Sequence, residues 1–209
     1  MGIKTNRSQD IRLSRPAEIY NSADPNYTFN NTCHIVFSET GATVSDLPDS
    51  VAVTSNESGN LVITSHTSKN INYKILGSGF GSLKVYSDHL FKLEMAGVTL
   101  SSSSGPAINL QSKKRAFVVA DEGTVNTFTD SSTYPTSNED QKGTIFSEGQ
   151  MIFCGSGSIK VTGSSKHAIC TDQYMIMDDG TITIPSAASD GIHVDSRFIM
   201  EGGVLNVTS

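Results

Sequence analysis

The stretch from Lys166 to Ala188 reads KHAICTDQYMIMDDGTITIPSAA, and the next residues, Ser189 to Ser209, read SDGIHVDSRFIMEGGVLNVTS. Both have a small residue before isoleucine, a polar gap, an apolar triplet, an acid with glycine, and an alternating run. A looser copy, GTIFSEGQMIFCGSGSIKVTGSS, precedes them at Gly143 to Ser165. A fixed period of 23 residues indicates a solenoid, in which each unit covers the apolar face of its neighbour.

The repeat is built from strands. The runs SIKV, TITI and VLNV alternate with period two and are rich in β-branched residues. The segments between them are short and polar, so they are turns with no room for a helix. A leucine-rich repeat has a similar period, but its L-x-x-L-x-L pattern is absent. Three short strands and three turns per coil predict an all-β parallel β-helix, with strands of successive coils about 4.8 Å apart.

The alternation sorts each coil into side chains inside the tube and side chains outside it. The residues predicted to point inward form stacked sets over three coils: Ile145, Met151, Phe153, Ile159 and Val161, then Ile169, Met175, Met177, Ile182 and Ile184, then Ile192, Phe198, Met200, Leu205 and Val207. Met151 and Phe153 come one residue early, so the pattern predicts a one-residue bulge near Cys154.

Similar short β runs continue upstream. We therefore expect residues 31–209 to form one β-helix domain, and residues 1–30, which show no period, to be a cap, a covering strand or a tail. The polar stretch TDSSTYPTSNEDQK (Thr129 to Lys142) is predicted to be an insertion. The last coil stops just after VLNV, so we expect the native chain to continue, or this end to be covered by another molecule.

Composition excludes several classes of function. The 209 residues carry a formal charge of -6, which argues against a nucleic-acid partner. The longest basic run, KKR (Lys113 to Arg115), is interpreted as a solvated turn. No apolar stretch approaches the roughly 18–20 residues of a membrane span. The three cysteines fit neither a disulfide framework nor a zinc pattern, so we expect buried thiols.

The stretch GSLKVYSDHLFKLEMAGVTLSSSSGPAINLQSKKRAFVVADEGTVNTFTDSSTY, followed by HAI, DGT, SDGI and EGGVLNV, resembles a bacterial family of carbohydrate-binding domain-containing proteins. The resemblance runs from about Cys33 to Ser209. It implies a right-handed β-helix of pectate-lyase-like shape, secreted or attached to the cell surface. It also implies no assigned catalytic role, calcium associated with the fold, and acidic plant cell-wall polysaccharides as ligands.

The resemblance has one departure and one consequence. Family members often carry an acidic pair after a small-Ile-x-Ser-Lys turn, whereas the matching positions here are Gly149–Gln150, Gln173–Tyr174 and Ser196–Arg197. No binding residue is therefore carried over from the family. The start MGIKTNRSQDIRLSRP lacks the apolar core of a signal peptide, so we expect an export signal to have been removed from an extracellular or surface-attached protein.

Outward positions beside the same turn are the candidate ligand site. Their first ladder is Gln150, Tyr174 and Arg197, and the next is an isoleucine stripe of Ile152, Ile176 and Ile199. An apolar floor with planar polar side chains suits sugar rings and their carboxylates. Three interpretations stay open for the stripe: sugar contact, cover by the N-terminal segment or a second copy, and plain exposure. Self-association through this stripe or through the open last coil is a further possibility.

Two pairs of carboxylates are candidate calcium ligands, since calcium prefers oxygen. Asp178 and Glu201 are predicted to stack in successive coils, where like charges repel unless a proton or cation joins them. Glu139 and Asp140 lie in the polar insertion, where Tyr134 is a further candidate for contact with a ligand.

The sequence thus favours non-catalytic binding of an extracellular, acidic polysaccharide with calcium. One alternative is a polysaccharide lyase or glycoside hydrolase, for which Asp178, Asp179 and Glu201 are the available carboxylates. No active-site motif accompanies them, and His167 and His193 have no Ser or Cys partner of motif quality. The other alternative is a structural or adhesive β-helix at the cell surface.

Overall fold

The computed structural model describes residues 27–56 and 58–208. This part of the chain contains strands and turns and no helix. The strands are β1 (Asn31–Ser38), β2 (Gly41–Ser45), β3 (Val51–Ser55), β4 (Asn60–Ser65), β5 (Ile71–Phe80), β6 (Ser82–Ser87), β7 (Phe91–Ser101), β8 (Ile108–Leu110), β9 (Ala116–Ala120), β10 (Val125–Thr129), β11 (Gly143–Ser147), β12 (Met151–Cys154), β13 (Ser158–Gly163), β14 (His167–Thr171), β15 (Met175–Met177), β16 (Thr181–Ala187), β17 (Ile192–Val194), β18 (Phe198–Met200) and β19 (Val204–Val207).

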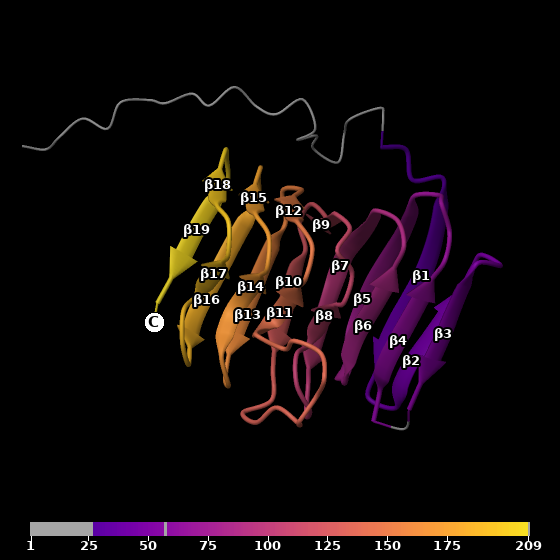
Figure 1. The fold of residues 1–209 in the computed structure, drawn as a ribbon, viewed down its shortest axis with the longest axis horizontal. Helices are drawn as coiled ribbons and strands as arrows, with labels where there is room; N and C mark the ends of the chain where they lie inside the picture. Colours follow the sequence, from indigo (N-terminus) through magenta and orange to yellow (C-terminus); the bar gives the residue numbers. More distant parts are fainter. Residues whose placement is uncertain (1–26, 57, 209) are drawn as a thin grey trace, which may run out of the picture.

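The strands form a parallel solenoid of about 6 turns, about 24 residues apart, which confirms the predicted fold class. Figure 1 shows the coils in a row, from indigo at β1 to yellow at β19. A seven-stranded sheet, β17-β14-β11-β8-β6-β4-β3, makes one wall. A 12-stranded sheet makes the other two, because the long β7 pairs with β9 on one wall and with β10 on the other.

The first end of the solenoid differs from the rest in strand direction. There β2 pairs antiparallel with β1, and β3 pairs antiparallel with β4. Two hairpins therefore close the N-terminal edges of the two sheets. Such closure protects backbone groups that an open parallel edge would leave unpaired.

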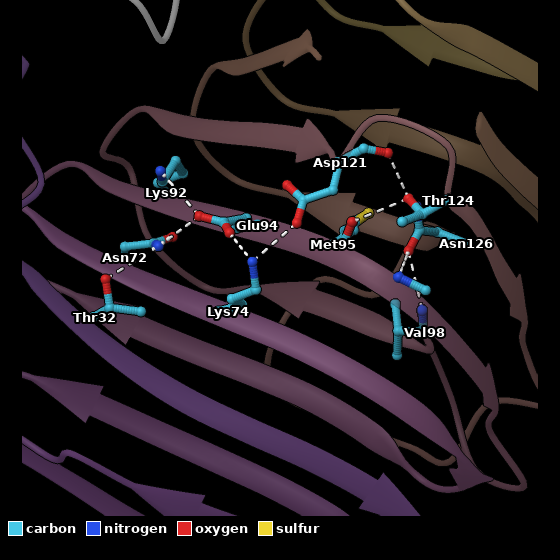
Figure 2. A network of polar contacts seen from close by, with 11 residues as sticks. Thr32, Asn72, Lys74, Lys92, Glu94, Met95, Val98, Asp121, Thr124 and Asn126 are labelled. Atoms are coloured by element: carbon cyan, nitrogen blue, oxygen red, sulfur yellow. Dashed lines mark hydrogen bonds and ion pairs between the residues drawn. The ribbon is translucent and has the colours of Figure 1, made fainter. Parts of the chain in front are cut away.

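Where β7 turns from one wall to the next, it holds one extra residue relative to β5, and Gly97 has a φ of 82°. The fully buried Asn126 serves this bend (Figure 2). Its Oδ1 accepts hydrogen bonds from the backbone N–H groups of Gly97 (2.9 Å) and Val98 (3.0 Å). The bend thus keeps its backbone donors satisfied inside the protein.

The predicted register is confirmed. Ile159 pairs with Ile182 and Ile182 with Leu205, 23 positions apart each time. Met151 pairs instead with Met175, 24 positions away. The extra residue lies in the turn between β12 and β13, beside Cys154, as predicted. A second shift, between Lys160 and Thr162 against β16, was not predicted.

The residues predicted to point inward form the core. Those of the first two coils named above, such as Ile145, Met175 and Ile184, are fully buried. In the last coil Phe198, Met200 and Val207 expose 36%, 47% and 46% of their area. The three cysteines, Cys33, Cys154 and Cys170, are buried thiols, as expected.

Candidate functional site

The residues that immediately precede β9, β12, β15 and β18 form a ladder along one turn edge of the solenoid: Arg115, Gln150, Tyr174 and Arg197. Backbone hydrogen bonds fix it, with Met151 N–H donating to the Tyr174 oxygen (3.2 Å) and Met175 N–H to the Arg197 oxygen (3.0 Å). The predicted stacking of Gln150, Tyr174 and Arg197 in successive coils is confirmed. Arg115 is a fourth rung that the sequence reasoning missed.

Arginine and tyrosine side chains join along this ladder. The Arg115 guanidinium donates hydrogen bonds to the hydroxyls of Tyr27 (2.9 Å) and Tyr174 (3.0 Å). The Arg197 guanidinium carbon lies 5.7 Å from the centre of the Tyr174 ring. Tyr174 is therefore held by cations at its hydroxyl and at its ring, so its orientation is fixed before any ligand arrives.

Two hollows run along the same edge and share Tyr27, His89 and Leu90. One, of about 440 Å³, also includes Lys113, Lys114, Arg115 and Gln150. The other, of about 520 Å³, continues toward the N-terminal end and includes Lys69 with several amide and hydroxyl side chains. We call the two together the turn-edge groove. The described residues that line it include four cations and no carboxylate.

The isoleucine stripe lies outside the tube, as predicted, but it is not exposed. Ile152 and Ile176 each expose 1% of their area and form a second apolar cluster with Phe117. The rings of Tyr27 and Phe29 pack on Phe117, with centroid distances of 5.2 and 5.9 Å. The prediction that Ile176 offers an open floor to a sugar ring is wrong, because apolar side chains that cannot enter the tube are covered on the outside.

Ile199, the third member of the stripe, is half-buried and packs against the same cluster. Its side chain therefore packs against this cluster and offers little open surface to a ligand. The covered interpretation of the stripe is therefore the one that the burial bears out. Self-association through an exposed stripe loses its basis, whereas the apolar side chains of the last coil remain exposed.

The polar insertion between β10 and β11 projects from the stack (Figure 1). Its candidate residues fasten it to the protein. Glu139 accepts hydrogen bonds from Lys84 (2.7 Å) and from the Tyr86 hydroxyl. Burial would raise the pKa of Glu139, but these two bonds lower it. Burial, with the bond to Glu139, raises the pKa of Tyr86 to about 12.

The other two candidates of the insertion are also paired. The Tyr134 hydroxyl donates a hydrogen bond to the buried carboxylate of Asp130 (2.7 Å). Burial of Tyr134, and to a smaller extent this hydrogen bond, raises the pKa of its hydroxyl. Asp140 lies 3.1 Å from the Lys142 ammonium. Because lysines already neutralise Glu139 and Asp140, these carboxylates do not fit a calcium site as they stand.

Asp178 and Glu201 follow the paired residues Met177 and Met200, so they stand in successive coils as predicted. Two carboxylates supply at most four oxygens, whereas calcium takes about 6–8. The pair alone does not complete a calcium site, and calcium binding stays a prediction.

A polar network covers the outer face of β5, β7 and the end of β9 (Figure 2). Lys74 contacts the carboxylates of Glu94 and Asp121, the second at 3.0 Å. Glu94 also accepts one hydrogen bond from Asn72 (2.7 Å) and contacts the ammonium of Lys92 (3.1 Å). Burial would raise the pKa of Glu94, but the bonds from Lys74, Lys92 and Asn72 lower it to about 2.

The lysine at the centre of this network is not a general base. The hydrogen bonds from Lys74 to Glu94 and Asp121 raise the pKa of Lys74, which keeps its amine protonated. A protonated amine cannot accept a proton from a sugar. The network therefore has the chemistry of a structural ion-pair cluster.

Over residues 27–56 and 58–208 the chain forms no helix with the length and hydropathy needed to cross a membrane.

Comparisons with known proteins agree with the fold. A family model described as "Carbohydrate-binding domain-containing protein" matches residues 50–209. A solved structure, the polysaccharide lyase-like protein from C. thermocellum in a gadolinium derivative, superposes with a TM-score of 0.60 at 15% identity. The match covers 85% of this chain and 97% of that one. No curated protein matches the chain.

Proposed function

Because the chain belongs to the carbohydrate-binding domain-containing protein family, we propose that it binds an acidic polysaccharide in the turn-edge groove without cleaving it. Acidic cell-wall polysaccharides lie outside cells, so the proposed place of action is extracellular or at the cell surface. Calcium is proposed as an accompanying ion at Asp178 and Glu201, outside the groove, because two carboxylates in successive coils attract a shared cation.

The charge of the groove is the observation that carries the proposal. The whole chain has a formal charge of -6, yet the described residues lining the groove include Lys69, Lys113, Lys114 and Arg115 and no carboxylate. In an acidic protein such a concentration of positive charge favours an anionic ligand. A guanidinium can also bind a sugar carboxylate through two hydrogen bonds.

The groove also has what a sugar needs besides charge. Tyr27 offers an aromatic ring that is half-buried at the wall shared by the two hollows. Gln150 and Asn70 offer amides that can donate to and accept from hydroxyl groups. Beyond Gln150 the ladder continues to Tyr174 and the exposed Arg197, which would extend the contact by two coils. The buried Ile176 and the half-buried Ile199 support this wall from behind.

Two observations favour binding over cleavage. Lys74, the lysine on the outer sheet face that contacts two carboxylates, is held protonated by them. The strongly acidic Glu94 beside it carries no proton to give to a leaving group. Lys74 is therefore unsuited to be the base of a lyase, and Glu94 to be the acid of a hydrolase. Cleavage is measured together with binding.

The test is retention of the protein by polygalacturonate and by a neutral glucan in affinity electrophoresis, with calcium and with a chelator. Replacing Lys113 and Lys114 together by alanine should weaken binding to the acidic polymer roughly tenfold or more, since two charge pairs are lost. Arg197→Ala should weaken it about tenfold and leave the melting temperature nearly unchanged, because Arg197 is exposed.

Lys160→Ala is the matched control, because Lys160 is also an exposed lysine but lies on β13, on another wall. It should bind like the parent protein. Equal binding by the parent protein and by the Lys113/Lys114 variant would refute the proposal that the turn-edge groove is the binding site. Appearance of unsaturated sugar ends or new reducing ends would refute non-catalytic binding and point to the enzyme alternative.

A further inference from the structure

Two histidines and one aspartate come together at the C-terminal end of the seven-stranded sheet. His167 is the first residue of β14, His193 lies in β17, and Asp190 lies in the turn before β17. The two imidazole rings stack with centroids 4.5 Å apart and planes 20° apart. Among the described residues, this is the one set of three such side chains whose ligand atoms all lie within 4.8 Å of one another.

The distances in this set suit a metal ion. His167 Nδ1 lies 3.2 Å and His193 Nδ1 lies 3.1 Å from Oδ2 of Asp190. Zinc binds nitrogen and oxygen ligands at about 2.0–2.2 Å, so two ligand atoms of a tetrahedral zinc site are about 3.3–3.5 Å apart. At least one imidazole ring must rotate to complete that geometry, because each Nδ1 lone pair lies in its ring plane and the two planes are only 20° apart.

The hydrogen bonds indicate which nitrogen atoms carry lone pairs. The backbone N–H of Asp190 donates to His167 Nδ1 (3.1 Å), so this Nδ1 is an acceptor. The same atom faces a carboxylate oxygen, which is also an acceptor. Two acceptors at 3.2 Å repel each other. A cation between them would turn this repulsion into coordination, taking the lone pair that the backbone N–H now uses.

The two ring nitrogens of the second histidine, His193, each face a carboxylate. His193 Nε2 lies 3.4 Å from Oδ1 of Asp195. Its Nδ1 is hydrogen-bonded to Oδ2 of Asp190 (3.1 Å), and a metal ion bound at Nδ1 would leave the proton on Nε2, where Asp195 can accept it. A carboxylate behind a metal-binding histidine is the usual means of fixing its tautomer and orientation.

From this geometry we propose that His167, Asp190 and His193 form a binding site for one divalent transition-metal ion, with Zn²⁺ as the best fit, and that Asp195 orients His193. Two imidazoles and one carboxylate suit zinc, nickel or copper far better than calcium, which prefers oxygen. His193 and Asp190 are 41% and 59% exposed, so solvent can supply the fourth ligand. The site is separate from the turn-edge groove and does not depend on the proposed function.

The test is a calorimetric titration of Zn²⁺ into the full chain, prepared without a histidine tag. We expect one equivalent to bind, and Co²⁺ in its place to give the visible absorption bands of a tetrahedral site. His193→Ala and Asp190→Asn should each weaken Zn²⁺ binding at least tenfold. Asp195→Asn should weaken it less, because Asp195 acts through His193. Calcium should not compete.

His66→Ala is the matched control. His66 Nδ1 lies 2.8 Å from Asp88 Oδ2 and is exposed, so it forms a histidine–carboxylate pair with no second histidine recorded beside it among the described residues. This variant should bind Zn²⁺ like the parent protein. Circular dichroism of each variant shows whether it is folded. Absence of Zn²⁺ binding by the folded parent protein, or undiminished binding by folded His193→Ala and Asp190→Asn variants, would overturn the proposal.

Discussion

A single ladder of outward positions on the 12-stranded sheet changes character halfway along the solenoid. Its residues, paired from strand to strand, are Thr32, Asn72, Lys92, Phe117, Ile152, Ile176 and Ile199. In the first half these side chains join a polar network centred on Glu94, with Lys74 and Asp121 as its other members (Figure 2). In the second half they form an apolar cluster against which Tyr27 and Phe29 pack.

The two halves show that backbone position does not decide what an outward side chain does. Every rung is outside the tube, yet Asn72 at 4% and Ile176 at 1% exposed are both buried. Polar rungs reach this state by hydrogen bonding to one another, and apolar rungs by being covered. Lys92 joins the halves, since its ammonium lies 5.3 Å from the centre of the Phe29 ring.

The largest expected effect is a charge placed in the apolar half. Ile176→Asp buries a carboxylate with no partner and should lower the free energy of unfolding by about 3–5 kcal/mol. Ile199→Asp makes the same change one rung further, where the side chain is only half-buried, and should cost less than half as much. Denaturant unfolding measures both. Equal and small losses at the two positions would mean that the apolar half is not covered.

The next effect is a pH dependence that belongs to the polar half alone. Folding lowers the pKa of Glu94 from 4.5 to about 2, so the unfolded chain binds a proton more readily than the folded one between these values. The stabilisation is fully present above about pH 4.5 and is lost as the pH falls toward 2. It amounts to at most about 3 kcal/mol.

The measurement is the free energy of unfolding of the parent protein and of Glu94→Gln at several pH values. The difference between the two proteins isolates Glu94 from other carboxylates, such as Glu139. This difference should shrink as the pH falls from 5 to 2. A difference that stays constant over this range would show that the network does not hold Glu94 ionised.

The smallest effect concerns one amide of the polar half. Asn72 donates a hydrogen bond of 2.7 Å to Glu94 and is almost fully buried, so Asn72→Ala should cost about 1–2 kcal/mol. Asn70→Ala, two residues earlier, removes a more exposed hydrogen bond to the Thr28 oxygen and should stay within about 0.5 kcal/mol. Thermal unfolding distinguishes the two variants. If both have the same small effect, Asn72 is not part of the network that stabilises this half.

Prediction from the sequence succeeded where contacts recur at a fixed spacing. The pairs Ile159–Ile182 and Ile169–Ile192 followed from the 23-residue period, and the bulge near Cys154 followed from a one-residue offset in it. The stacking of Gln150, Tyr174 and Arg197 was predictable for the same reason. The bulge in β16 was missed, because it lies where the TITI alternation ends, and its one signal, Pro185, was not interpreted as a bulge residue.

By itself the sequence determined the solenoid, the register of its coils and the side of the wall on which each residue of the last three coils lies. A period and an alternation contain this information, because neighbouring coils place equivalent residues against each other. Only the tertiary structure decided what meets on the outside. Tyr27 reaches Arg115 across 88 positions, and His167 stacks on His193 although the two hold different places in the repeat. Such contacts depend on the lengths and directions of side chains at the turns, which no periodic pattern records.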